Sequence, residues 1–565
     1  MSTGDEPLNV GLTKEVMSFC THATKPCEVV AALVRTDYAS IYPTPRAVMQ
    51  VLAVVRDFQP RLMNYVTVVR GVNVSLLGVD KWVFERDVDR GFLGEALAGA
   101  LVFPYAALKN ERYLEFEETK LKKRLITELL ENLVLDFPEL SYELHVKPEY
   151  FMYETMLTRG RLFPPTLYAF ADLVTDKHKD IECSLRGFLV AAKELERDGI
   201  LYRTNGLLRI SEDFVDRVRA RKIRFTDFFK AGQKALFTAA LGLFPQFFDA
   251  VSRNHNEFLK LQKAFLDESK IMQGIEDPEN YVYVQTSSGL VSLGNRVDIE
   301  QYARKELAAE KNADIKIRSV GGILNDVYLV ELLTKDRLRK VIVKRFRDWA
   351  DFKWFPLTVW SAGTRKFAIA GISRLEKEWA INRLLASHGF AVPKLLHISP
   401  VERLVIMEYV EGESLGGIVR RILNARNGDL ETNLDVVKRV GGTFARVHAL
   451  NVALGDSKPE NVLVKKNGEI CLMDFEQASR NGDLVWDVAE FLYYSGHYVS
   501  PAFDTTKIQR FAETFTRGYL ESGGKASVVK KAAGAKYTKV FSIFTFPHVI
   551  LAISNTCRRA EELKT

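Results

Sequence analysis

The chain has 565 residues, of which 47% are hydrophobic and 27% charged, as in an ordinary soluble protein with room for three or four domains. Lys and Arg total 79 against 72 Asp and Glu, so the net charge of +7 permits an anionic partner without requiring one. Five cysteines are too few, and odd in number, for a disulfide framework, and we expect free thiols in a reducing, cytoplasmic compartment. The acidic, polar N-terminus is not expected to hold a signal peptide.

Residues 1–155 suggest no particular chemistry. Helical periodicity over residues 121–135 alternates with short apolar strands around residues 65–77, which indicates a mixed α/β region of unknown role. We interpret Asp87-Val-Asp89 as a solvated turn, with a metal-binding acidic pair as the alternative.

Residues 156–225 show the order of elements found in a winged helix. A helix over 165–173 precedes a second helix that we expect to begin at an N-cap, Ser184, and an Asn205-Gly206 pair then predicts a hairpin. Winged helices often bind nucleic acid through the second helix. Because the charges on this helix are mixed in sign, a role in protein contact or as a spacer is the alternative.

Residues 226–284 are expected to form a helical connector. Their most apolar run, residues 235–248, is shorter than the roughly 20 residues that span a membrane. We predict a packed helix here, with an interfacial helix as the alternative, and therefore no transmembrane segment. Residues 277–280 predict a turn before the next domain.

A strand over residues 315–320 leads into Gly321 and Gly322, and a second strand begins shortly after Asn325. Adjacent glycines let backbone N–H groups approach phosphates closely, although Gly-Gly is also an ordinary hairpin link. The apolar strand that follows ends at Lys344.

The next helix is predicted from a capping box, with Ser373 as N-cap and Glu376 at the third helical position. Glu378 lies on the same helix. A buried strand then runs through Met407 to Glu408 and is followed by Val410.

An Asn-Gly pair at residues 467–468 lies midway between Asn461 and Asp474, with apolar β-formers on both sides. A two-residue turn would place Asn461 directly opposite Asp474 on an antiparallel ladder, so that their side chains share a face. Hard oxygen ligands grouped in this way suit Mg²⁺. Asp456 lies five residues before Asn461, on the loop that leads in.

These residues, as Asp456-x-Lys458-Pro-Glu-Asn461 followed by Asp474-Phe475, resemble the catalytic loop and metal-binding segment of the protein-kinase superfamily. The resemblance implies phosphoryl transfer from ATP. Asp456 would accept the proton of the acceptor hydroxyl and Lys458 would lie near the transferred phosphate. Asn461 and Asp474 would hold Mg²⁺.

The resemblance covers roughly residues 285–520, and it also implies a nucleotide site in which Lys344 contacts the phosphates and pairs with Glu378. The backbone at Glu408 and Val410 would bond the purine. The residues that we assign to the nucleotide in this way are Gly321, Gly322, Asn325, Lys344, Glu378, Met407, Glu408 and Val410.

The chain departs from eukaryotic protein kinases at two motifs. Leu454-Gly455-Asp456 stands in place of His-Arg-Asp, and Asp474-Phe475-Glu476 stands in place of Asp-Phe-Gly. The Gly-Asp loop is typical of the RIO-like kinases and the KEOPS-complex kinase, which are atypical protein kinases. A Trp486-Asp487 pair is similar to that of aminoglycoside and choline phosphotransferases. A winged helix also precedes the kinase domain in RIO-type kinases.

The sequence therefore predicts an α+β multidomain chain in which a bilobal, protein-kinase-like catalytic domain follows a mixed α/β region and a winged helix. The catalytic domain is expected over residues 285–565, with a small lobe over 285–410 and a large lobe over 411–565. We expect an atypical serine/threonine kinase that uses ATP and Mg²⁺ and acts on a protein, with nucleic acid as a further partner of the winged helix. The alternatives are a small-molecule phosphotransferase and a slow ATPase that regulates a partner.

Overall fold

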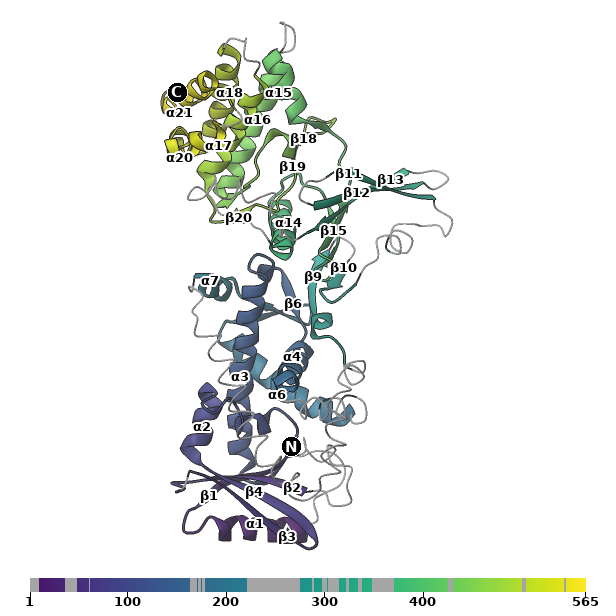
Figure 1. The fold of residues 1–565 in the computed structure, drawn as a ribbon, viewed down its shortest axis with the longest axis vertical. Helices are drawn as coiled ribbons and strands as arrows, with labels where there is room; N and C mark the ends of the chain where they lie inside the picture. Colours follow the sequence, from purple (N-terminus) through teal and green to yellow (C-terminus); the bar gives the residue numbers. More distant parts are fainter. Residues whose placement is uncertain are drawn as a thin grey trace. The chain divides into compact units, whose positions relative to one another are not determined.

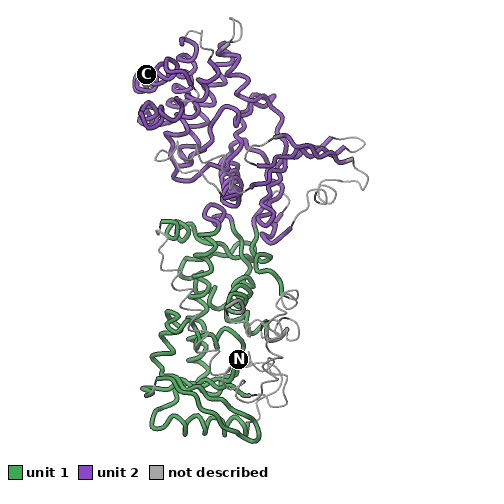
Figure 2. Tube along the Cα trace, viewed as in Figure 1, with its two compact units in different colours: residues 1–136, 144–283 green, residues 137–143, 284–565 purple. Residues whose placement is uncertain are grey.

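In the computed structural model the chain folds into two compact units (Figure 2). Unit 1 holds residues 1–136 and 144–283, and unit 2 holds residues 137–143 and 284–565. Within these, the structure describes residues 10–35, 48–59, 61–162, 170, 174, 178–220, 275–286, 289–296, 302, 314–321, 325–333, 338–347, 370–424, 430–499, 505–542 and 545–564. Unit 2 begins one residue before the expected catalytic domain and also takes in the short segment 137–143, which nothing in the sequence predicts.

A five-stranded sheet with the order β3-β4-β2-β1-β5 lies in unit 1 (Figure 1). Its strands are β1 (Val29–Arg35), β2 (Val48–Val55), β3 (Leu62–Val69), β4 (Val72–Asp80) and β5 (Tyr105–Lys109). β2 and β4 run parallel and the other neighbours antiparallel. Helix α1 (Val10–Ala23) buries Val16 and Cys20 in one core with the apolar strand residues.

Helix α2 (Lys81–Arg90) follows β4, and the long helix α3 (Glu111–Asp136) confirms the helical period expected there. Asp87 lies within α2 and is fully buried, so its expected place in a solvated turn is wrong. Its carboxylate accepts backbone N–H groups from the chain that follows, at Leu93, Glu95, Leu97 and Ala98. A buried carboxylate needs such donors, and they make Asp87 a structural residue.

The winged-helix segment agrees with its prediction in part. Helix α6 (His178–Arg197) begins six residues before Ser184, which lies buried inside it, so the expected N-cap is wrong. The hairpin does form, with Asn205 and Gly206 at positive φ, as a two-residue turn of the primed type requires. Its strands are β7 (Leu201–Thr204) and β8 (Leu207–Ile210), and β6 (Leu144–Val146), α4 (Pro148–Leu162) and α7 (Glu212–Ala220) complete the segment.

The helix expected over 165–173 falls mostly outside the described residues, so the winged helix stays a prediction. The apolar run over 235–248 lies outside them entirely. Among the helices that are described, none combines the length and apolar character needed to cross a membrane. The turn expected over 277–280 is a 3₁₀ helix, η4 (Pro278–Tyr281), capped by Asp277, and it leads into β9 (Val282–Thr286) and β10 (Gly289–Ser292).

Unit 2 contains an antiparallel sheet of order β11-β12-β13-β15-β14. The strands are β11 (Asp314–Gly321), β12 (Asn325–Leu333), β13 (Leu338–Phe346), β14 (Leu395–Ser399) and β15 (Leu404–Glu408). Val330, Val343 and Ile406 are among the residues of its small core. Helix α14 (Gly371–Ser387) lies against β13, β14 and β15.

The expected capping box of α14 is wrong. The helix begins at Gly371 after Ala370, so Ser373 lies within the first turn instead of before it. Glu376 is fully buried and accepts hydrogen bonds from the backbone N–H groups of Glu139 and Leu140 instead of capping the helix.

Helices make up most of the larger lobe (Figure 1). They are α15 (Leu415–Asn424), α16 (Leu430–Ala449), α17 (Leu484–Ser495), α18 (Thr506–Glu521), α19 (Ala526–Ala532), α20 (Ala535–Phe541) and α21 (Pro547–Arg558). They share one core with the apolar residues of the lobe's short strands. These strands are β16 (Glu413–Ser414), β17 (Val452–Ala453), β18 (Val462–Val464), β19 (Ile470–Leu472) and β20 (Ser479–Arg480). The loops around β17 to β19 are therefore anchored by strands that pack in the helical core of this lobe.

Candidate active site

Lys344 on β13 is the centre of a buried ionic cluster. Its Nζ lies 2.9 Å from Oε2 of Glu378 on α14, so the ion pair expected from the sequence is present. The same Nζ lies 2.6 Å from Oδ1 of Asp474 and 3.0 Å from Oε2 of Glu476, on the segment after β19. One cation therefore links the sheet, the helix and the segment that carries the candidate metal ligand.

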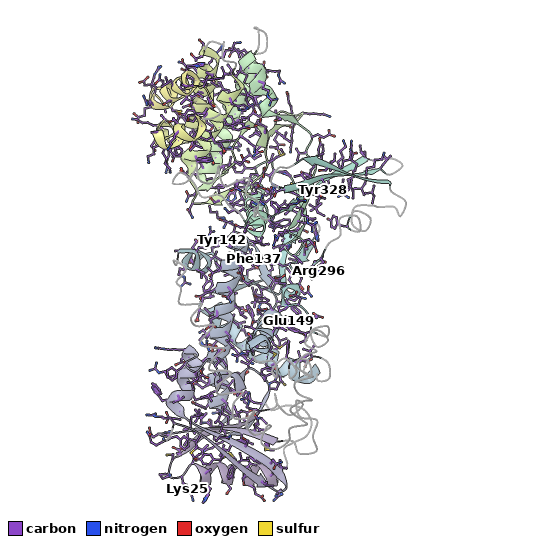
Figure 3. The ribbon with its side chains drawn as sticks, viewed as in Figure 1. Lys25, Phe137, Tyr142, Glu149, Arg296 and Tyr328 are labelled. Atoms are coloured by element: carbon purple, nitrogen blue, oxygen red, sulfur yellow. The ribbon has the colours of Figure 1, made fainter. Side chains whose placement is uncertain are left out.

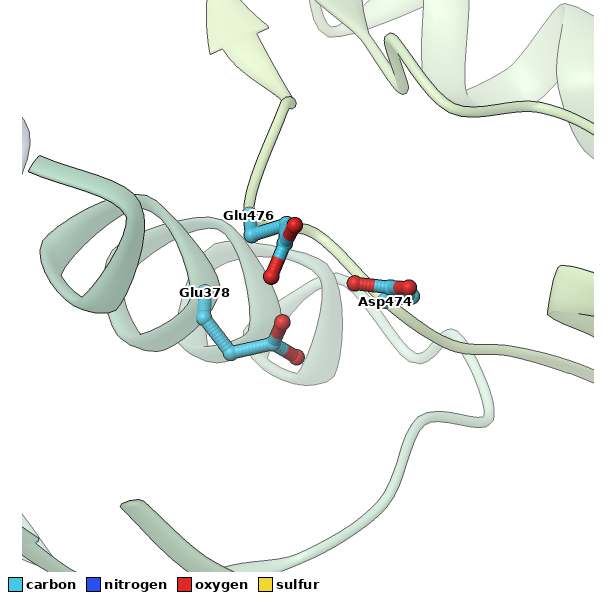
Figure 4. A group of neighbouring side chains, drawn as sticks. All are labelled: Glu378, Asp474 and Glu476. Carbon is cyan, nitrogen blue, oxygen red and sulfur yellow. The ribbon is translucent and has the colours of Figure 1, made fainter. Parts of the chain in front are cut away.

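Glu378, Asp474 and Glu476 direct their carboxyl groups toward one another (Figure 4). One oxygen atom from each lies within 4.8 Å of the others. Burial acts to lower the pKa of Lys344, but the charges of Asp474, Glu378 and Glu476 outweigh it and hold that pKa well above its ordinary value. Burial alone would raise the pKa of Asp474, but Lys344 outweighs it and the pKa is lowered. At neutral pH Lys344 is thus charged and Asp474 ionised.

A second buried cation, Arg374 of α14, extends the cluster. Its Nη1 donates to Asn325 Oδ1 at 2.7 Å and lies 3.5 Å from Glu476 Oε1. The Asn325 amide donates in turn to the Glu476 carboxylate. Asn325 was assigned to the nucleotide from the sequence, and the structure shows that its side chain joins β12 to the Asp474–Glu476 segment. Gly321 ends β11, and Gly322 lies outside the described residues.

The expected catalytic loop brings Asp456, Lys458 and Asn461 together. Lys458 Nζ donates to Asp456 Oδ2 at 2.9 Å, and Asn461 Nδ2 donates to the Asp456 carbonyl at 2.8 Å. Burial raises the pKa of Asp456, with the charge of Lys458 opposing the shift and that of Asp474 adding to it. A raised pKa suits a group that must accept a proton during a reaction.

The register expected for the 461–474 hairpin is wrong by one residue. β18 pairs with β19 so that Val462 faces Leu472, and Lys465 donates to Glu469 across a three-residue loop. Gly468 takes positive φ in that loop, which is the three-residue alternative to the two-residue turn. The backbone carbonyl of Asn461 therefore bonds Met473 instead of lying opposite Asp474.

Asp474 follows Met473 with φ of 64°, which turns the chain out of the strand. Its carboxylate consequently meets Lys344, while Asn461 meets the Asp456 loop. Both side chains still act on the same group, because the hydrogen bond of Asn461 and the charge of Asp474 each affect the pKa of Asp456.

Asp487 of α17 holds the catalytic loop in place, a role that the sequence did not reveal. Its fully buried carboxylate accepts Leu454 N–H at 2.6 Å and Gly455 N–H at 2.8 Å, and it lies 3.1 Å from His448 Nε2. His448 also lies 2.8 Å from the Tyr519 hydroxyl, so its ring lies between two buried partners. The Trp486-Asp487 pair was the available signal, but its spacing gives no hint of these partners.

Glu490, three residues further along α17, holds Ser457 of the same loop. It accepts the Ser457 N–H at 2.7 Å and the indole N–H of Trp486 at 3.1 Å. The two acids of α17 together fix residues 454–457, and with them the position of Asp456.

The segment whose backbone is expected to bond the purine begins at the end of β15. Met407 is buried, and the N–H of Glu408 donates to the Lys394 carbonyl at 2.9 Å. This bond leaves the carbonyl of Glu408 and the backbone of Val410 as the groups assigned to the purine, and that assignment stays a prediction.

The site fits a nucleotide polyphosphate and a divalent cation by the chemistry of its donors. Lys344 and Lys458, which here pair with Asp474 and Asp456, would supply two ammonium groups for phosphate oxygens. Asp474 is one-third exposed at its side chain, so it can offer an oxygen atom outward, and the amide oxygen of Asn461 is a second hard ligand. These roles for ATP and Mg²⁺ stay predictions.

Two comparisons with known proteins bear on this domain. Residues 333–511 match the Lipopolysaccharide kinase (Kdo/WaaP) family. The KEOPS complex subunit Bud32 of Pyrococcus abyssi is 24% identical over 155 residues, which make up 27% of this chain and 65% of that protein. Both matches support a C-terminal domain of the atypical protein-kinase-like superfamily, in agreement with the sequence motifs and the two-lobed arrangement.

Proposed function

We propose that the protein-kinase-like domain is an ATP- and Mg²⁺-dependent phosphotransferase whose acceptor is a serine or threonine hydroxyl of a protein. One observation carries the proposal. Nζ of Lys344 lies within 3.0 Å of carboxyl oxygens of Glu378, Asp474 and Glu476. It thus joins strand β13 to helix α14 and to the segment after β19 that carries Asp474. The kinase-family matches support the phosphotransferase class.

The chemistry needs cations and positioning more than covalent groups, because charge is spread over the moving phosphoryl group. Lys344 would orient the nucleotide phosphates, and Lys458 would offset the charge that develops on the transferred group. Asp456 would orient the acceptor hydroxyl and take its proton. Bound between Asn461 and Asp474, Mg²⁺ would neutralise phosphate charge.

Lys458-Pro459 favours a protein acceptor, since this pair resembles the Ser/Thr protein kinases. A small-molecule hydroxyl is the second candidate. It is favoured by the match to a lipopolysaccharide kinase family and by Glu476, which replaces the glycine of Asp-Phe-Gly. The third candidate is a slow ATPase that regulates a partner. We also propose that the protein is cytoplasmic.

The test is transfer of the γ-phosphate of ATP, with and without Mg²⁺, to three kinds of acceptor. These are the protein itself, a generic basic protein and a panel of sugars and amino alcohols. The proposal expects Mg²⁺-dependent phosphoserine or phosphothreonine. Transfer to metabolites alone would replace it by the second candidate, and release of free phosphate alone by the third. Asp474→Ala controls for contaminating kinases.

A further inference from the structure

Residues 137–143, here called the strap, belong to the catalytic unit although their neighbours on both sides belong to unit 1. Phe137, its first residue, and Tyr142, the residue before its last, are labelled in Figure 3. The chain enters the strap from α3 and leaves it into β6. The catalytic unit is therefore built from two separate stretches of sequence.

The strap is bonded to helix α14 through Glu376. The carboxyl oxygen Oε2 accepts the Glu139 N–H at 3.1 Å and the Leu140 N–H at 3.5 Å, and both residues are buried. Near the end of the strap, Glu143 lies 3.6 Å from Arg383, one turn from the end of the same helix.

Glu376 and Glu378 hold α14 from two sides. Residues two apart on an α-helix are separated by about 200° around its axis, so their side chains leave nearly opposite faces. Glu378 meets Lys344 of the sheet, and Glu376 meets the strap. A contact on each face of α14 thus fixes the helix in the position in which Glu378 reaches Lys344.

The strap also contacts the larger lobe. The guanidinium of Arg480 on β20 lies 3.8 Å from the centre of the Tyr142 ring, a close cation–π contact with a buried aromatic residue. Arg480 follows Asp474 by six residues. One short segment therefore touches both parts of the chain that bring carboxylates to Lys344.

We propose that the strap, through Glu376 and Tyr142, positions α14 and the segment after Asp474, so that the catalytic site of this chain is completed by residues from its N-terminal half. Glu376 and Tyr142 are positioning residues that act through Glu378 and Asp474. The inference rests on the proposed phosphotransferase function for its kinetic readout, but it also makes a structural claim about α14.

The test uses the full-length chain with two matched pairs of variants. Glu376→Leu removes the oxygen acceptor at similar volume, and Glu376→Gln keeps one. Tyr142→Leu removes the ring under Arg480, and Tyr142→Phe keeps it. Ser387→Ala, on the exposed end of α14, serves as a control, because its hydroxyl bonds within the last turn of the helix and not to the strap.

Two readouts are compared: hydrogen exchange at the backbone amides of α14, and kcat and KM for ATP in the transfer assay. We expect Glu376→Leu and Tyr142→Leu each to speed exchange across α14 and to lower kcat/KM by about tenfold, which corresponds to 1.4 kcal/mol. Glu376→Gln and Tyr142→Phe should keep exchange in α14 and kcat/KM close to the wild-type values. Exchange rates and kinetics that are equal within each pair would overturn the inference.

The exchange readout separates this inference from the proposed function. If the wild-type chain transfers no phosphate, the function fails, and faster α14 exchange in the leucine variants still decides the role of the strap. If Glu376→Leu does not fold, the Tyr142 pair decides it from the other lobe.

Discussion

Nζ of Lys344 lies closer to Oδ1 of Asp474, at 2.6 Å, than to Oε2 of Glu378, at 2.9 Å. Lys344 is therefore shared between Asp474, the candidate metal ligand, and Glu378 of helix α14. A buried cation surrounded by carboxylates cannot be removed without leaving like charges unpaired. This relationship makes Lys344 important for stability as well as for nucleotide binding.

Lys344→Met is expected to impair both properties. The Glu378, Asp474 and Glu476 carboxylates would face one another without their shared cation, and the unfolding free energy should fall by about 3–5 kcal/mol. Phosphate transfer should fall by about 100-fold or more, since a positioned cation is lost from the phosphates. Denaturant unfolding and kcat/KM measure the two effects. Lys344→Arg, which keeps the charge, should retain more stability than Lys344→Met, and equal losses would contradict the charge argument.

Asp474 and Asp456 are expected to fail in different ways. Asp474→Ala should abolish Mg²⁺-dependent turnover and weaken binding of the ATP–metal complex, because it removes the hard ligand beside Lys344. Asp456→Ala should lower kcat by about 100-fold or more while ATP affinity stays near that of the wild type, because Asp456 acts on the acceptor. Calorimetric titration with a non-hydrolysable ATP analogue and a transfer assay separate them. Equal loss of binding in both variants would contradict this division of roles.

Glu376 should make stability depend on pH. Burial raises its pKa from 4.5 to about 8, with the N–H donors of the strap opposing the shift. Between these values the folded chain holds a proton that the unfolded chain releases. The contribution of Glu376 to the free energy of unfolding is therefore fully present below about pH 4.5 and is lost as the pH rises to about 8.

The loss is at most about 1.4 kcal/mol per pH unit. Glu376→Gln cannot titrate, so the unfolding free energy of the wild type, relative to this variant, should fall from pH 5 to pH 8. Denaturant unfolding at the two pH values measures that difference. A difference that stays constant with pH would mean that Glu376 is ionised in the fold.

The sequence predicts local chemistry better than it predicts register and long-range partners. The Lys344–Glu378 pair follows from a strand lysine and a helix glutamate in a known order, and the structure contains it. The alignment of Asn461 with Asp474 fails because an Asn-Gly pair is compatible with loops of two or three residues, and one extra residue shifts the register.

Glu376 shows a different reason for failure. Its spacing from Ser373 matches a capping box, yet its partners, Glu139 and Leu140, lie more than 230 residues away. A local pattern carries no information about such a partner. The same holds for Asp487, whose contacts with the catalytic loop depend on how α17 packs below it.

Gly518 is expected to be essential for packing in the larger lobe. Helices α16 and α18 approach so closely there that a Cβ atom at Gly518 would lie 1.9 Å from the Lys438 carbonyl oxygen. The clash is with backbone, so a rotamer change cannot relieve it and the helices must separate. Gly518→Ala should therefore lower the unfolding free energy by about 3 kcal/mol, at the upper end for overpacked cores. Arg517→Ala, exposed on the same helix, should change it by less than about 0.5 kcal/mol. Chemical denaturation of both variants measures the contrast, and a Gly518→Ala variant as stable as Arg517→Ala would show that α16 and α18 are not in this contact.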